Sequence, residues 1–335
     1  MSVGLWVVFA VLLSMAFAQG REIARNPSIS LRFTQPVSGE AAFGARQYGI
    51  AQDTFWPTFW EEEMLRVQVR GQTTQVTGIS FSGDGALVWP AVYVAGGVPA
   101  SIDGVGVALS TGLAHRLFAS TDIVGMAVYV NDSPRVIRGV FDYAGELVLV
   151  SYSMEYRGRS FTAAELAGGP NHPTRQDVES FALLAGLGRP GHIVTTAPTT
   201  LATMLPWLPL MFPVLFALWK VLAFGKTYYP RSVTPMVLGG LVVLAVALPF
   251  LLGALPYWMI PTHFSDFAFW SGLRDQAADS VRGFFALNPT LVDVEQRLAL
   301  LRLGVTVLGA LIVGIVVCKF SKSYGNEATP VDYLK

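Results

Sequence analysis

The sequence predicts a membrane protein: an α-helical transmembrane bundle that carries a mixed α+β extracytoplasmic domain. Hydrophobic residues make up 52% of the 335 residues and charged residues only 14%, and the mean hydropathy is +0.48. Ordinary soluble domains are less apolar than this. The 23 basic and 23 acidic side chains cancel, which excludes the basic surplus that a nucleic-acid-binding protein needs.

Four apolar runs define the expected membrane spans, because about 20 residues cross the hydrocarbon of a bilayer. The first run, residues 1–20, is either a retained helix or a signal peptide. Ala16-Phe17-Ala18 is similar to a small-residue cleavage site, but no Lys or Arg precedes the run. The other runs are residues 201–224, 233–261 and 303–318. The bundle therefore has four helices, or three after signal cleavage.

The basic residues between and after these runs predict the topology. Lys220 precedes the loop of residues 225–232, Lys226 and Arg231 lie in it, and Lys319 and Lys322 lie in the tail of residues 319–335. Loops with such a basic excess stay in the cytoplasm. Residues 21–200 and 262–302 are therefore expected outside. This orientation suits an integral protein of a plasma or inner membrane, and the first of the two outer segments is long enough for a core of its own.

Within the outer segment, short apolar or alternating runs are separated by Gly, Pro, Asn and Asp, a pattern typical of strands, and three stretches have a helical apolar face. The expected strands are residues 31–35, 63–69, 74–81, 86–94, 106–110, 127–131 and 135–141, and the expected helices are residues 39–50, 110–118 and 176–187. The domain is therefore mixed α+β.

Residues 107–141 carry a more specific pattern. It consists of Val107-Ala108-Leu109-Ser110, Leu117-Phe118, Val124-Gly125, Val128-Tyr129-Val130-Asn131 and a strand closing on Gly139-Val140. This pattern resembles the core of the extracytoplasmic domain in the MacB/FtsX family of ABC transporter permeases. Gly125 fits a tight turn and Gly139 a bulge or a close approach. The order of spans and the ending Pro330-Val331-Asp332-Tyr333-Leu334-Lys335 also resemble that family.

The resemblance implies a non-catalytic permease-like subunit that transmits ATPase-driven motion to its outer domain, in export, extraction or control of envelope processes. It implies a cytoplasmic ABC ATPase partner, a second permease-like subunit and lipid contacts. The cytoplasmic residues that would meet the ATPase are Lys226, Arg231, Pro330, Tyr333, Leu334 and Lys335. The cytoplasmic loop is shorter than the coupling segment of the family. A scaffold or binding subunit without ATPase coupling therefore stays open as the alternative.

The sequence shows no constellation of catalytic residues, so no enzyme activity, metal or cofactor is expected. Gly225-Lys226-Thr227 has the end of a phosphate-binding loop, but Lys220 stands where that loop needs a glycine. The four histidines are isolated and Cys318 is the single cysteine. Glu61-Glu62-Glu63 is expected to be a solvated strand edge rather than a set of paired catalytic carboxylates.

Two further segments suggest movement or anchoring. Pro206, Pro209 and Pro213 fall in the outer part of the second span, where they would kink a helix and could hinge the outer domain. The alternative is a helix that begins near Pro209 or later, after extended chain. The outer loop of residues 262–302 combines Phe and Trp with charges, which is typical of an amphipathic interfacial segment or of aromatic anchoring at the membrane surface.

Overall fold

The computed structural model describes residues 2–25, 28–153, 157–169, 175–194, 197–210, 271, 278, 282–285 and 289–326. The chain divides into two units. The outer domain comprises Asn26–Thr196 and Asp279–Val294, and the helical unit comprises Met1–Arg25, Ala197–Ala278 and Glu295–Lys335.

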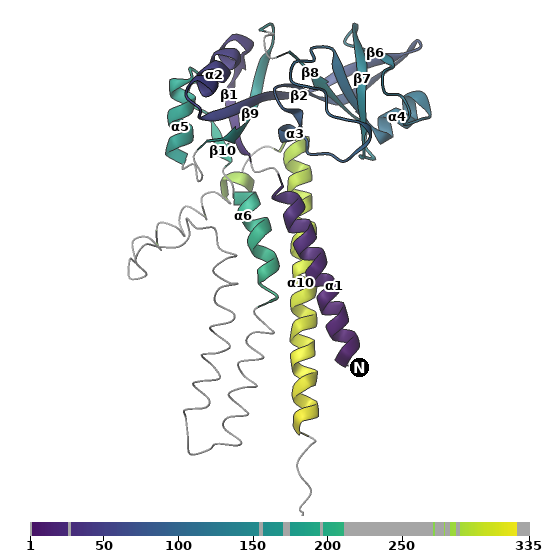
Figure 1. Ribbon diagram of the computed structural model, residues 1–335, viewed down its shortest axis with the longest axis vertical. Coiled ribbons are helices and arrows are strands. Elements are labelled where there is room, and N and C mark those ends of the chain that lie inside the picture. The colour runs from purple at the N-terminus through teal and green to yellow at the C-terminus, as the bar shows by residue number, and fades with distance from the viewer. Residues whose placement is uncertain are drawn as a thin grey trace, which may run out of the picture. The chain divides into compact units, whose positions relative to one another are not determined.

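The outer domain is built on one sheet with the strand order β10-β1-β9-β2-β3-β8-β5-β7-β4, to which β6 adds by pairing with β2 and β7 (Figure 1). The strands are β1 (Ile29–Ser38), β2 (Phe55–Val69), β3 (Gln72–Ser82), β4 (Tyr93–Gly96), β5 (Gly106–Ser110), β6 (Ala127–Val130), β7 (Ser133–Phe141), β8 (Leu147–Ser151), β9 (Ser160–Gly168) and β10 (His192–Val194). The helices are α2 (Gly39–Ala51), α3 (Gly85–Val88), α4 (Thr111–Phe118) and α5 (Arg175–Leu184).

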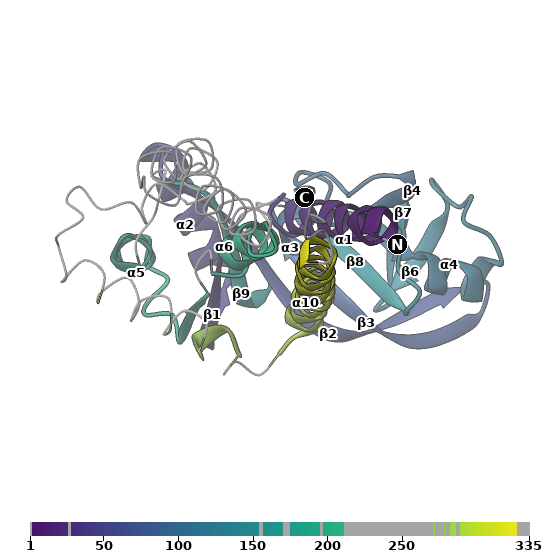
Figure 2. The same ribbon diagram turned by 90° about the horizontal axis from the view of Figure 1, so that it is seen from below.

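Most strand pairs are antiparallel, whereas β3–β8 and β5–β7 are parallel. The long β2–β3 hairpin connects the part of the sheet near β1 and β9 with the part near β6 and α4 (Figure 2). Its turn places Arg70 at φ 48° and Gly71 at φ 85°. Two successive positive φ angles suit the twist of a tight hairpin.

Three groups of buried side chains form the core. One lies under α4 and includes Leu109 and Leu113, and a second packs α2 and α5 on β1 and β9. The third, here called the aromatic core, consists of Trp60, Ile79, Phe81, Val88, Trp89, Ala108, Phe141, Leu147, Leu149 and Ala163. Leu291 and Val292 pack against this third group, so a segment far along the chain completes the domain.

The sequence-predicted pattern of residues 106–141 is confirmed as β5, α4, β6 and β7. Gly125 has a φ of 88° in its turn, and a Cβ on Gly139 would lie 2.8 Å from the Gly97 nitrogen. The expected strand over residues 86–94 is wrong. Asp84 caps the short helix α3 by accepting from the Ala86 N–H, and only Tyr93–Gly96 is a strand.

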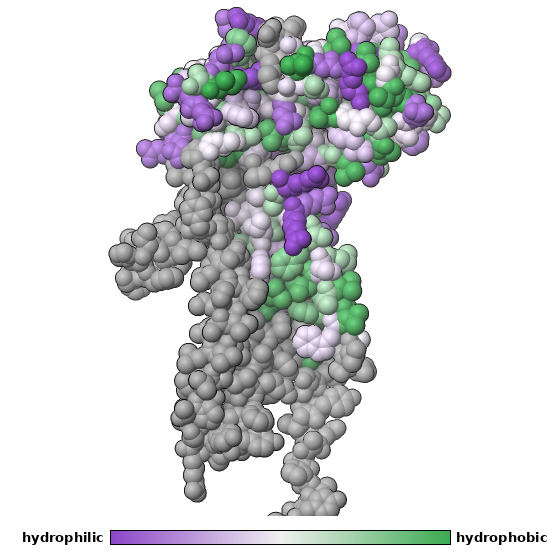
Figure 3. All heavy atoms as spheres, viewed as in Figure 1, coloured by the Kyte–Doolittle hydropathy of each residue, from purple (hydrophilic) through white to green (hydrophobic). Residues whose placement is uncertain are grey.

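The described part of the helical unit contains α1 (Ser2–Ile23), α6 (Ala197–Met204), the short 3₁₀-helix η1 (Leu205–Trp207) and α10 (Leu291–Asn326), whose first turn belongs to the outer domain. Among the described residues two helical segments are long and apolar enough to cross a membrane, Gly4–Ile23 and Leu291–Val317. Figure 3 shows apolar side chains gathered on α1. Most of the expected second and third spans, and about half of the expected outer loop of residues 262–302, lie outside the described residues. The last part of that loop differs from the prediction, because residues 291–302 are already helical and belong to α10, which begins before the predicted fourth span of residues 303–318.

Helices α1 and α6 pack closely through small side chains. Ala16 and Ala202 are fully buried, and a Cβ on Gly20 would overlap the carbonyl oxygen of Ala202. Beside them the rings of Phe17 and Trp207 meet edge to face, with 5.2 Å between their centroids. Small residues at such a contact allow two backbones to approach, which is the usual basis of helix association in lipid.

Candidate functional site

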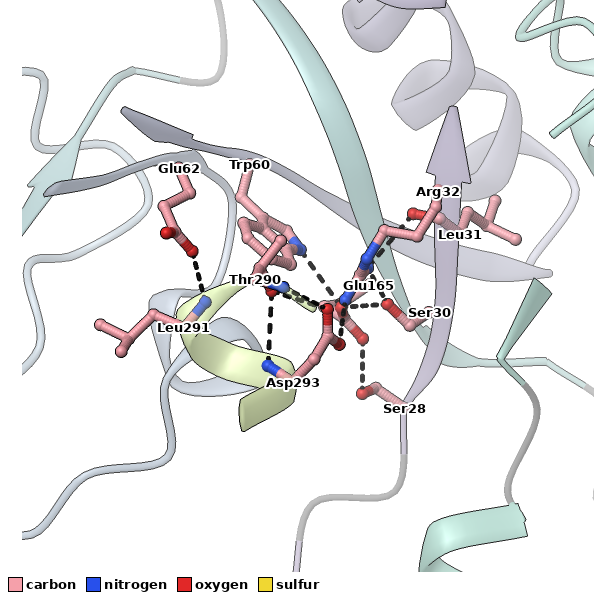
Figure 4. Close-up of polar contacts among 10 residues, drawn as sticks. All are labelled: Ser28, Ser30, Leu31, Arg32, Trp60, Glu62, Glu165, Thr290, Leu291 and Asp293. Atoms are coloured by element: carbon pink, nitrogen blue, oxygen red, sulfur yellow. Dashed lines mark hydrogen bonds and ion pairs between the residues drawn. The ribbon is translucent and has the colours of Figure 1, made fainter. Parts of the chain in front are cut away.

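A buried polar network joins β1, β2 and β9 to the first turn of α10, all within the outer domain (Figure 4). Its inner member is Glu165 on β9. The Glu165 carboxylate accepts hydrogen bonds from the hydroxyls of Ser28 (2.8 Å) and Ser30 (2.5 Å) and from the indole N–H of Trp60 (3.1 Å). Because both of its oxygens are engaged, Glu165 is satisfied by the domain itself.

Arg32 on β1 bridges Glu165 and α10. Its Nη1 lies 3.3 Å from Oε1 of Glu165, and its Nη2 donates to Oδ1 of Asp293 at 2.8 Å. The guanidinium carbon is 4.7 Å from the centre of the Trp60 ring, a distance suited to a cation–π contact. The side chains of Arg32, Glu165 and Asp293 are only 12%, 6% and 4% exposed.

The start of α10 is capped from both sides. Asp293 Oδ2 accepts from the N–H and the hydroxyl of Thr290, and the Thr290 hydroxyl accepts in turn from the Asp293 N–H. This reciprocal pattern is a capping box with Asp in the place of Glu. Glu62 on β2 accepts from the Leu291 N–H at 2.6 Å. Two carboxylates thus meet the positive end of the helix dipole.

The arrangement is suited to holding a helix rather than to chemistry on a substrate. Each carboxylate of the network is engaged by donors from the chain. No group of His, Cys, Asp and Glu able to hold a metal ion occurs among the described residues. The network therefore fixes the first turn of α10 to three strands of the outer domain.

The Glu61-Glu62-Glu63 run differs from the solvated strand edge that its sequence suggests. All three side chains are half-buried, and each has a partner in the fold. Glu63 pairs with Arg159 and accepts from the Ser80 hydroxyl, Glu61 lies 4.0 Å from Arg159, and Glu62 caps α10. Burial and then the neighbouring Glu63 charge raise the pKa of Glu61.

Of the predicted site residues, Lys226, Arg231, Pro330, Tyr333, Leu334 and Lys335 lie outside the described residues, as does Pro213. Pro206 is buried in η1 directly after the end of α6, and Pro209 lies in the turn that follows. The extended-chain alternative is wrong for residues 197–207, which are helical. The break between α6 and η1 has the cause expected for proline, which donates no N–H to a helix.

Arg32, Glu165 and Asp293 are not among the residues predicted from the sequence, because their contacts join residues 133 and 261 positions apart. One local signal was present. Thr290-Leu291-Val292-Asp293 has the spacing of a capping box immediately before an apolar run. That signal marks the helix start and says nothing of its partner on β1.

No protein-family model and no curated protein matches this chain. Solved structures do. The periplasmic region of MacB from Actinobacillus actinomycetemcomitans is 14% identical, with a TM-score of 0.43, over 52% of this chain and 91% of that one. The extracellular domain of the noncanonic ABC-type transporter YknZ from Gram-positive bacteria is 12% identical, with a TM-score of 0.36, over 47% and 88%.

A third similar structure is a domain of a protein described as a permease from Porphyromonas gingivalis, at 13% identity and a TM-score of 0.34, over 48% of this chain and 83% of that one. The family named from the motifs of residues 107–141 thus recurs among the similar structures. The mixed α/β character of the outer domain follows from its own strands and helices.

Proposed function

We propose that the chain is a non-catalytic, permease-like membrane subunit of an ABC-type complex that transmits motion between the cytoplasm and its outer domain. The proposal rests on the junction, which is the contact of Arg32, Glu62 and Glu165 in the outer domain with residues 290–293 at the start of α10. A helix with the length and composition of a membrane span has its first turn packed against the aromatic core of the outer domain, where Arg32 and Glu62 hold it. A domain attached in this way can follow the displacement of a membrane helix.

The four-span arrangement is part of this proposal, with residues 1–20, 201–224, 233–261 and 303–318 in the membrane. The close approach of Gly20 to Ala202 on α6 supports a retained first helix. An ATPase would then bind the loop of residues 225–232 and the tail of residues 319–335. A second permease-like subunit would complete the complex.

Cysteine labelling tests the topology. In a Cys318→Ser background, cysteines placed at Asp84 and Asp279 are expected to react with a membrane-impermeant maleimide in intact cells. Cysteines at Thr227 and Ser323 are expected to react only after permeabilisation, because basic residues near span ends keep these segments inside. Labelling of the Thr227 position in intact cells would contradict the orientation.

Deleting Pro330–Lys335 tests ATPase coupling. The loop Lys220–Arg231 offers two or three helical turns at most, so contact with an ATPase should depend on the tail, where Tyr333 and Leu334 are apolar anchors. The deletion is expected to abolish copurification of the ATPase in mild detergent while the outer domain stays protease-resistant. Retention of the ATPase by the shortened chain would refute this dependence. If no ATPase copurifies with the intact chain, the scaffold function is the better one.

A further inference from the structure

We propose that the outer domain carries a receptor site for a helix start, and that the first turn of α10 occupies this site as a separable docking segment. The receptor consists of Arg32, Glu62 and the adjoining surface of the aromatic core; the docking segment is Thr290–Asp293. The inference concerns this contact alone and holds whether or not an ATPase binds.

Three features of the receptor recognise different properties of the segment, and Figure 4 shows the two polar ones. The Arg32 guanidinium binds the Asp293 carboxylate at 2.8 Å. Glu62 accepts from the main-chain N–H of Leu291, a group that only the first turn of a helix leaves without an internal partner. The aromatic core receives the apolar side chains of Leu291 and Val292. The preferred ligand is therefore a capped helix start with two apolar residues followed by an acid.

The receptor is complete without its ligand, which is why the segment can leave. Arg32 is held by Glu165 and lies over the Trp60 ring, so it keeps a counter-ion when Asp293 departs. Glu165 in turn keeps its bonds to Ser28, Ser30 and Trp60. Undocking therefore leaves no uncompensated charge buried in the domain, which is the main cost of breaking most buried ion pairs. Asp293 and Glu62 become hydrated instead.

Hydrogen exchange of the full-length protein in detergent, followed by mass spectrometry, separates docking from folding. Asp293→Asn is expected to raise the exchange rate of amides 290–294 about 10- to 100-fold, the factor that loss of one charged hydrogen bond predicts. Exchange in β1 and β9 should stay unchanged. Glu62→Leu, which leaves the capping box intact, should give the same local increase. Glu165→Gln should raise exchange in β1 and β9 as well.

Asp103→Asn is the matched control, because it removes a partly buried ion pair with Arg138 (2.6 Å) elsewhere in the outer domain. It should leave amides 290–294 as in the parent protein. The proposal is overturned if Asp293→Asn and Glu62→Leu change these amides less than twofold. It is also overturned if exchange in β1 and β9 rises together with that of the α10 turn, since the segment would then be an inseparable part of the domain core.

Discussion

Arg32→Met should lower the free energy of unfolding of the outer domain by about 3–5 kcal/mol, the usual cost of removing one partner from a buried ionic group. Arg32 is the cation between Glu165 and Asp293, whose side chains are 6% and 4% exposed. While the first turn of α10 stays docked, methionine leaves two carboxylates facing each other in a site with little water. Undocking would relieve this repulsion only by giving up the Glu62 cap and the packing of Leu291 and Val292. No other ion pair is formed by either carboxylate among the described residues.

The measurement is pulse proteolysis of the full-length protein in increasing urea, with the surviving outer domain detected by an antibody. The matched control is Arg116→Met. Arg116 pairs with Glu146 on the surface, where the side chains are 52% and 37% exposed, so water screens the pair and its loss should leave the urea midpoint almost unchanged. Equal urea midpoints for the two variants would show that the Arg32 network contributes no special stability.

Gly20→Leu should separate α1 from α6. Even one added carbon at Gly20 would overlap the Ala202 carbonyl and lie 3.2 Å from the Pro206 ring, so a leucine must push the two backbones apart. Overpacking of this kind costs about 1–3 kcal/mol, and it removes the close approach on which helix association in lipid depends.

Cross-linking reports this separation directly. With cysteines at Phe17 and Trp207, whose rings are in contact, a short bismaleimide should link α1 to α6 within one chain only where the two helices meet. The product should fall to background with Gly20→Leu and persist with Gly4→Leu, since an added Cβ at Gly4 has no neighbour within 4 Å. Efficient cross-linking in the Gly20→Leu protein would contradict the packing.

A mature chain that lacks residues 1–18 would give no product in any variant and would support signal cleavage.

The part of the fold that could be predicted from the sequence is the part in which turn-forming residues separate the strands. From β5 to β7, turn residues such as Gly125 and Asn131 separate short apolar runs, and the predicted limits agree closely with the strands. Strand β9 has no such pattern. Its centre, Ala163-Ala164-Glu165-Leu166, consists of good helix formers, and pairing with β1 and β2 on its two edges makes it a strand.

The contacts of Arg32 with Glu165 and Asp293 could not be predicted from the sequence, for a related reason. A lone Arg in β1 and a lone Glu in β9 are ordinary in a sequence, because strands of outer domains often carry exposed charges. They are buried because β1 pairs with β9 and because Asp293 contacts Arg32. Both contacts join residues far apart in the sequence. By contrast, the helix break before Pro206 was predictable from the missing N–H of one residue.

The long sequence separation of the junction has a consequence for synthesis. Arg32 and Asp293 are 261 residues apart. Because a ribosome adds about 5–20 residues per second, roughly 10–50 s pass between the synthesis of Arg32 and that of Asp293. During the first part of this interval β1 also lacks β9, and an unpaired strand edge invites association with other chains. Biogenesis of this protein therefore includes a period in which the nascent domain must be shielded. Synthesis of the first turn of α10 ends the interval by supplying Asp293.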